Sequence, residues 1–247
     1  MALPLRWFPC WRGLLLALLL PGPSGVGQEA GPVDRRAAIE ALMQTSRSME
    51  SIPFREVVLA ASGHPVIAID GNSGPDKALL EHLSRAGDAL LGWLNGPGKP
   101  AGQFRRINEA SSLVEEKLRV LLNTGDFLCT RPPTTSGKAQ RSGYPDLQIL
   151  HRPSGRITYL DPKLFGIDTR SSSLRSFYYE PNALTGKVSQ PARHLLLGIS
   201  HDGKAMDWTF GQWELLDLFH LQVRLKAEFQ SANRDIYKEN LLLRKSR

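Results

Sequence analysis

The sequence predicts an α/β fold in which a mixed central β-sheet is flanked by helices. Three observations lead to this prediction. Apolar residues recur at helical spacing over residues 104–123. Three short strand-like segments follow, at residues 126–131, 144–151 and 156–165. Residues 193–201 then have a continuous apolar centre, which is typical of a strand buried on both faces of a sheet.

The helix at residues 104–123 has a distinct apolar stripe and a distinct end. Gly125 follows its last turn, where glycine readily adopts left-handed backbone angles. On the helical wheel Glu115 lies at the margin of the apolar stripe, beside Leu118. Glu116 points away from the stripe. Glu115 can therefore face the core edge, whereas Glu116 is expected to be a solvated helix charge.

Residues 144–151 and 156–165 are expected to form a β-hairpin. If the four residues between them form the loop, counting back along the strands puts Asp146 directly opposite Asp161. A three-residue loop with a bulge at Gly155 remains an alternative. It would shift the register by one position and send Asp161 to the other face of the sheet.

Strand geometry brings three charged side chains to one patch of this hairpin. Side chains alternate between faces, so Asp161 and Lys163 share a face with Tyr159. In the four-residue register Asp146 joins them from the neighbouring strand. Two acids and a lysine are then suited to holding a divalent metal and a water molecule.

This pattern resembles the PD-(D/E)xK nuclease superfamily, whose members have the restriction-endonuclease-like fold. The matching residues are Pro145-Asp146, then fourteen residues, then Asp161-Pro162-Lys163. The resemblance covers residues 104–210, under half of the chain. It supports a restriction-endonuclease-like core for the predicted α/β fold.

The resemblance also implies roles for individual residues. In the family two acids bind Mg²⁺, the lysine positions or activates the attacking water, and a helix commonly adds a glutamate. Carried over by position, Asp146, Asp161 and Glu115 would be metal ligands. All three would be catalytic together with Lys163.

Some features of the chain argue against this interpretation. The family often places a helix between its third and fourth strands, but residues 168–191 show no clear periodicity. Pro162 would remove a ladder hydrogen bond from its strand, which fits a bulge or a bend, or counts against the strand. Acid-x-Lys triplets also occur at 115–117 and 202–204, and a second Pro-Asp at 75–76. The alternative is a cross-strand ion pair on a solvated sheet face.

Beyond the buried strand, a hairpin and then a helix are expected. The Asp202-Gly203 turn leads into residues 204–210, a candidate partner for the buried strand. From Gln212 the chain is rich in Leu and Phe as far as Phe229, which we interpret as a flanking helix.

The segment 96–102, rich in glycine and proline, marks the best domain boundary. Before it the chain is expected to form helices at residues 35–50 and 77–94 and a strand pair within 54–69. Residues 28–100 would thus be a small, mainly helical N-terminal region, and residues 101–247 the nuclease-like domain. The N-terminal region shows no residues that predict chemistry.

Residues 1–27 are interpreted as a secretory signal peptide. Arg6 and Arg12 precede the apolar run 13–20, and small residues follow it. The run is too short to span a bilayer. Export would make the protein secreted or periplasmic, whereas a start codon chosen upstream in error would leave it cytoplasmic. After cleavage Cys129 is the remaining cysteine, so no intramolecular disulfide can form.

The charge of the chain bears on its partners. A formal net charge of +7 is compatible with a phosphate-backbone partner but does not require one. Six basic residues are expected in loops around the proposed site, where they would contact phosphates: Arg141, Arg152, Arg170, Arg175, Lys187 and Arg193.

Together these features predict a Mg²⁺-dependent nuclease that hydrolyses phosphodiester bonds of DNA. One alternative is a nuclease-like domain that has lost catalysis and only binds. A second is an exported structural or interaction protein with a surface patch of acid–lysine ion pairs. Convergence of Glu115, Asp146, Asp161 and Lys163 in one cleft would favour the nuclease over both alternatives.

Overall fold

The computed structural model describes residues 34–173, 177–182 and 185–244. The expected signal peptide lies outside these residues and stays a prediction. The chain divides into two units, Met1–Leu42 and Met43–Arg247. Helix α1, Arg35–Ser48, buries none of its side chains. Among the described residues, no helix combines the length and apolar character needed to cross a bilayer.

The second unit contains a five-stranded sheet. Its strands are adjacent in chain order, β2–β3–β4–β5–β6, and comprise Phe127–Thr130, Leu147–His151, Arg156–Gly166, Arg193–His201 and Phe210–Asp217. β4 and β5 run parallel, and every other neighbouring pair is antiparallel. The sheet is therefore mixed, as predicted for an α/β fold of the restriction-endonuclease type.

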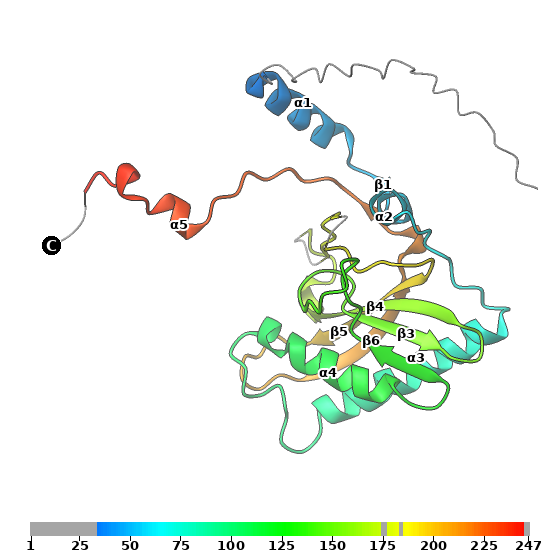
Figure 1. The fold of residues 1–247 in the computed structure, drawn as a ribbon. Helices are drawn as coiled ribbons and strands as arrows, with labels where there is room; N and C mark the ends of the chain where they lie inside the picture. The colour runs from blue at the N-terminus through cyan, green and yellow to red at the C-terminus, as the bar shows by residue number, and fades with distance from the viewer. Residues whose placement is uncertain (1–33, 174–176, 183–184, 245–247) are drawn as a thin grey trace, which may run out of the picture. The chain divides into compact units, whose positions relative to one another are not determined.

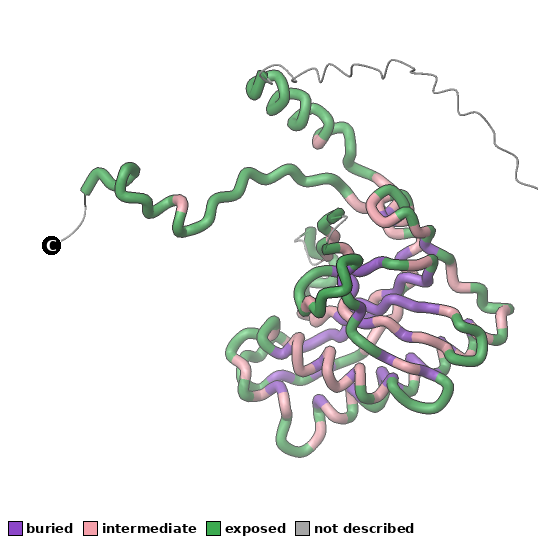
Figure 2. Tube along the Cα trace, in the orientation of Figure 1, coloured by how far each residue is buried: buried purple, intermediate pink, exposed green. Residues whose placement is uncertain are grey.

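One face of the sheet is covered by α3 (Gly74–Leu94) and α4 (Ser111–Leu122), as Figure 1 shows. A short 3₁₀ turn, Ile107–Ala110, leads into α4. Apolar residues of both helices and of the sheet form one core cluster, with Leu118 and Leu160 fully buried in it. The burial of this cluster drives the helices onto the sheet. Figure 2 shows the buried positions along the strands.

The other face is covered in part by α2, Phe54–Ser62, which was expected to be a strand pair. That prediction was wrong. Phe54 and Val58 are four positions apart and both fully buried, so one side of a helix faces the sheet. Phe54 packs edge-on against the ring of Tyr144. Before α2, β1 (Ile52–Pro53) pairs with β7 (Gln222–Val223), a short ribbon separate from the main sheet.

The predicted hairpin register is confirmed. His151 pairs with Arg156 and Leu147 with Leu160. Continued by one position, this register places Asp146 opposite Asp161. β3 begins at Leu147 rather than at residue 144, because the chain enters it through Pro145, which has no N–H to donate to a ladder.

Pro162 lies inside β4 but beyond the last residue paired with β3. Past Leu160, β4 continues beside β5, where Pro162 is in register with Leu197. A proline is tolerated where one side of a strand has no neighbour. The described residues of the following link, 168–173, 177–182 and 185–191, contain no α-helix, as expected.

The helix expected over residues 212–229 was a wrong prediction. Most of that segment is β6, a 3₁₀ turn at Leu218–His220 and β7. Trp213 and Leu215 pack toward the α3 and α4 side, while Leu216 is exposed. This alternation is that of a strand. The expected strand over 204–210 is a turn that reaches β6 only at Phe210.

The segment 96–102 does not divide the chain into domains. It joins α3 to α4, and both helices contribute to the same core cluster. The compact unit begins at Met43 and runs to the C-terminus. Residues 43–100 therefore pack as part of the sheet domain, because α3 buries one side of that sheet. α5, Asn233–Ile236, and a 3₁₀ turn at Glu239–Leu241 follow near the end of the chain.

Candidate active site

An ion pair on β4 lies at the centre of the site. The Nζ atom of Lys163 is 2.6 Å from Oδ2 of Asp161. Both side chains project from the same face as Tyr159, since they lie two and four positions further along the strand. The Asp161 side chain is 3% exposed and that of Lys163 is 32% exposed. The Asp161 carboxylate is thus buried, while the Lys163 side chain is partly exposed.

Asp146 brings a second carboxylate to the same ammonium. Its Oδ2 atom lies 3.8 Å from Nζ of Lys163, and its side chain is 17% exposed. Asp146 precedes β3, and Asp161 lies in β4. The hairpin register therefore brings the two acids and the lysine together, as the sequence predicted. Their catalytic roles remain predictions.

Burial dominates the electrostatics of Asp161. Desolvation raises the pKa of Asp161 to about 7; the Lys163 charge opposes that shift, and the negative charge of Asp146 adds to it. Ionisation of this carboxyl group therefore leaves a charge that the protein only partly neutralises. A further cation at this position would favour the ionised form.

Glu115 on α4 lies at the edge of the same site. Burial raises the pKa of Glu115, and the charge of Asp146 raises it further, so the two carboxyl groups interact. The adjacent Glu116 points elsewhere. It forms ion pairs with Arg119 at 2.5 Å and with Arg131 at 2.9 Å. The two glutamates thus differ in the way that the helical wheel predicted.

The residues present fit a hard divalent cation. Carboxylate oxygens are the ligands that Mg²⁺ prefers. Oδ2 of Asp161 is buried and accepts no hydrogen bond from any described residue, since the Lys163 contact lacks hydrogen-bond geometry. In this part of the chain no three His, Cys, Asp or Glu side chains are grouped closely enough to form a metal cluster. The cation between Asp146 and Asp161 is instead Lys163.

A buried tyrosine–histidine pair lies next to the two aspartates. The hydroxyl of Tyr144 is 2.7 Å from Nδ1 of His194, which is fully buried. Burial lowers the pKa of His194 to about 3, so its ring is neutral at ordinary pH. Burial also raises the pKa of Tyr144, and the negative charge of Asp161 raises it further. The tyrosine therefore stays protonated beside the site.

A pocket of about 710 Å³ opens beside Lys163. It runs from the end of β4 across β5 to β6, and its lining includes Gly198 and Glu214. Gly198 is in register with Lys163. A Cβ atom at Gly198 would come within 3.2 Å of the Phe165 ring, so glycine lets that ring lie close to the strand. Because Lys163 lines the pocket, a ligand bound there would lie beside this lysine.

The basic residues expected to contact phosphates fall into different environments. Arg141 and Arg152 are exposed. Arg170 is also exposed but forms an ion pair with Glu214 at 2.9 Å. Arg175 lies outside the described residues. Arg141 is thus exposed in the loop before Asp146, as predicted, whereas Arg152 is exposed in the β3–β4 turn, at the end of the hairpin opposite to Asp146 and Asp161.

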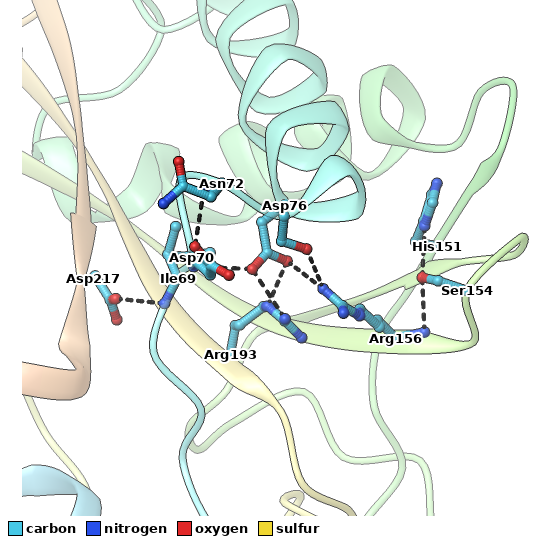
Figure 3. Close-up of polar contacts among 10 residues, drawn as sticks. Ile69, Asp70, Asn72, Asp76, His151, Ser154, Arg156, Arg193 and Asp217 are labelled. Carbon is cyan, nitrogen blue, oxygen red and sulfur yellow. Dashed lines mark hydrogen bonds and ion pairs between the residues drawn. The ribbon is translucent and has the colours of Figure 1, made fainter.

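Lys187 and Arg193 were expected to contact phosphates from exposed loops, but both side chains lie in the interior of the protein. They are 1% and 6% exposed. Lys187 donates to backbone carbonyls. Arg193 pairs with Asp76, whose carboxylate also contacts Arg156 at 3.2 Å (Figure 3). Buried basic groups with internal partners are not available to a nucleic acid in this structure.

Asp76 is a structural residue that the sequence interpretation missed. It belongs to the second Pro-Asp and lies in the first turn of α3. Its side chain is 1% exposed, and Figure 3 shows it between Arg156 and Arg193. The local sequence showed only a proline at the start of a helix followed by an acid. Its partners lie 80 and 117 residues further along the chain.

The sheet domain as a whole is similar to a known family of proteins. Residues 46–240 match the model of the type II restriction enzyme MjaV family. The type II restriction enzyme MjaV of Methanocaldococcus jannaschii is 28% identical over 212 residues, which cover 82% of this chain and 92% of the relative. The family match contains the complete sheet and the proposed site residues, and it begins after the expected signal peptide.

Proposed function

Because the chain belongs to the type II restriction enzyme MjaV family, and so to the PD-(D/E)xK nucleases, we propose that it is a Mg²⁺-dependent endonuclease that hydrolyses phosphodiester bonds of DNA. The observation that carries this proposal is the position of Lys163. Its ammonium lies within 4 Å of two carboxylates, that of Asp161 in β4 and that of Asp146 just before β3, and the Asp161 side chain is almost fully buried. Family membership supports DNA cleavage, and the carboxylate geometry supports the metal.

Asp146, Asp161 and Glu115 would hold the metal ion. Bound Mg²⁺ would act as a Lewis acid on the scissile phosphate and lower the pKa of a water molecule. Asp161 would supply the most buried oxygens of the three residues. Its raised pKa indicates a carboxylate whose charge the protein alone does not neutralise.

Lys163 would act on the substrate itself. Its ammonium is a hydrogen-bond donor, and Lys163 lines the pocket beside β4. From there it would orient the attacking water and stabilise the negative charge that develops on the phosphate oxygens. Asp146 and Asp161 hold this ammonium in place before a substrate arrives.

DNA would approach from the pocket side of the sheet. α3 and α4 cover the other face, whereas the pocket is lined by residues of β4, β5 and β6. Arg141 and Arg152 are exposed and would contact the phosphate backbone. Such contacts position the duplex without reading its sequence.

A cleavage assay tests the proposed function. Purified protein would be incubated with a long viral DNA, because a sequence-specific enzyme needs its recognition site in the substrate. Discrete fragments are expected with Mg²⁺, and none with EDTA. The Asp161→Asn variant, purified in the same way, controls for a contaminating nuclease. Absence of cleavage by the wild type with either Mg²⁺ or Mn²⁺ on several long DNAs would overturn the proposal.

A further inference from the structure

Lys187 is a buried lysine whose ammonium, among the residues that the structure describes, donates hydrogen bonds to main-chain oxygens. Its Nζ atom donates to the carbonyls of Gly143 at 2.7 Å, Arg141 at 3.2 Å and Pro145 at 3.3 Å. An ammonium group has three N–H donors, so all three have an acceptor. The residue is 1% exposed. A buried charge persists only when it is paired or fully hydrogen-bonded, which these three carbonyls achieve.

The three acceptors belong to the loop that delivers Asp146. Pro145 directly precedes it, and Gly143 lies three residues before it. Gly143 has φ +87°, a backbone angle that side chains other than glycine rarely adopt. This angle helps to direct the loop carbonyls toward one point. Lys187 therefore gathers a non-repetitive segment around a single donor group.

Asp146 itself lacks the support of a strand ladder. β3 begins one residue later, at Leu147. A side chain outside the ladder keeps its position only if the preceding backbone is held by other contacts. The preceding residue, Pro145, has no N–H with which to form such a contact. Its carbonyl is instead an acceptor of Lys187, one peptide unit away from Asp146.

The charge of Lys187 acts in the same direction as its hydrogen bonds. Burial lowers the pKa of Lys187, and Asp146, Glu115 and Asp161 oppose that shift in decreasing order. The lysine thus interacts electrostatically with each of the three acids proposed to hold Mg²⁺, most strongly with Asp146. A positive charge behind a group of carboxylates favours their ionised forms.

From these contacts we propose that Lys187 is a positioning residue, which sets the location of the Asp146 carboxylate by holding the loop of residues 141–145. It does not touch DNA. This inference rests on the proposed function, in which Asp146 is a metal ligand. Outer residues that orient metal ligands affect metal affinity or activity by about 10- to 100-fold when they are replaced.

Two substitutions and one control test this role. Lys187→Met removes the three donors but keeps an apolar stem of similar length. Lys187→Gln retains an amide that can donate at shorter reach. The control is Leu218→Ala, which removes a buried apolar side chain on the same face of the sheet, far from the loop in sequence. The control separates loss of stability from loss of positioning.

Four measurements are made on the full chain, well below the melting temperature of each variant. They are amide hydrogen exchange of peptides from residues 141–147, Mn²⁺ binding by calorimetry, kcat and KM for DNA cleavage, and the salt dependence of DNA affinity. In Lys187→Met the loop should exchange faster, while β4 stays protected. Mn²⁺ affinity or kcat should fall by about 10- to 100-fold with little change in KM. Lys187→Gln should lie between Lys187→Met and the wild type.

Several results would overturn the proposal. Unchanged loop exchange in Lys187→Met would do so, as would kcat and Mn²⁺ affinity equal to those of Leu218→Ala. A salt slope smaller by about one would mean a phosphate contact instead of a positioning role. If neither Lys187 variant folds, the residue is required for folding and the positioning role is rejected. If the wild type cleaves no DNA, the proposed function fails, whereas loop exchange and Mn²⁺ binding still decide the role of Lys187.

Discussion

Asp76 in the first turn of α3 pairs with Arg193 in the first position of β5. Nη2 of Arg193 donates to Oδ2 of Asp76 at 3.0 Å, and Nε lies 2.8 Å from Oδ1. Both side chains are more than nine-tenths buried. This pair links a helix of the N-terminal half to the central sheet. Asp76 also accepts a hydrogen bond from the backbone N–H of Asp70, so its carboxylate organises the chain that leads into α3.

Asp76→Asn should destabilise the fold strongly. The substitution leaves the buried guanidinium of Arg193 without a counter-charge, and breaking one side of a buried pair costs about 3–5 kcal/mol. Arg156 is 40% exposed and can be solvated, so the loss comes chiefly from Arg193. Urea unfolding followed by circular dichroism measures the change.

The control for Asp76→Asn is Asp207→Asn. Asp207 is paired with Lys99 at the surface and is 69% exposed. Losing that pair should cost about 0–1 kcal/mol. Equal destabilisation by the two substitutions would show that the buried network does not hold α3 to the sheet.

The hairpin and its charged patch could be predicted because their determinants are local. A four-residue loop and strand alternation placed Asp146 opposite Asp161 and put Lys163 on the same face. The buried strand, Arg193–His201, was also recognisable from its apolar run. The phase of α4 followed from the spacing of its apolar residues.

What could not be predicted depends on contacts distant in sequence. The segment from Gln212 is rich in Leu and Phe, a composition that suits a buried helix as well as a buried strand. Its pairing with β5, which is distant in sequence, makes it a strand. The partners of Asp76 and Lys187 are likewise remote, and the acceptors of Lys187 are carbonyls, which every residue carries. A lysine in a loop looks solvated until the fold buries it.

Replacing His194 should change how stability depends on pH. The pKa of His194 is lowered from 6.5 to about 3 by burial, so only the unfolded chain binds its proton near pH 5. This histidine therefore removes stability as pH falls from about 6.5 toward 3, by up to about 1.4 kcal/mol per pH unit. Asp161 acts in the opposite sense, because its raised pKa removes stability as pH rises toward 7.

The effect of His194 is isolated by subtraction. The stability of His194→Asn minus that of the wild type should increase by about 2 kcal/mol between pH 7 and pH 5. Denaturant unfolding at several pH values gives this difference, with the exposed His220→Asn as control. A difference that stays constant with pH would mean that folding does not lower the pKa of His194.

Lys163→Ala should abolish cleavage and leave DNA affinity nearly unchanged. The ammonium is proposed to act on charge that develops in the transition state, so its loss lowers kcat by about 100-fold or more. The matched control is Lys204→Ala, from the other Asp-x-Lys triplet, whose side chain is 74% exposed. Cleavage kinetics and a binding titration would be measured for both. Equal kcat values would rule out the proposed role of Lys163.

Asp161→Asn should inactivate the enzyme and stabilise its fold at pH 8. A neutral amide is a poor ligand for Mg²⁺. The pKa of Asp161 is raised from 3.8 to about 7 by burial, so ionisation of this group opposes folding. The wild-type protein therefore loses stability as the pH rises from 3.8 to 7. Above that range the variant should gain about 1–3 kcal/mol, and less than that at pH 5. A variant that is less stable than the wild type at pH 8 would contradict this account of the buried charge.

Glu115 and Glu116 are adjacent on α4, and exchanging each for glutamine should separate a site residue from a surface residue. Glu115 interacts with Asp146, whereas Glu116 is paired with Arg119 and Arg131. Whether Glu115 binds the metal directly or orients another ligand, Glu115→Gln should weaken Mn²⁺ binding and lower kcat by about 10- to 100-fold. Glu116→Gln should leave both within about a factor of three, since exposed ion pairs contribute little. Calorimetry with Mn²⁺ and cleavage kinetics measure the two effects independently. If Glu116→Gln proved the more damaging substitution, the metal site would have to lie on the outer side of α4, away from Asp146 and Asp161.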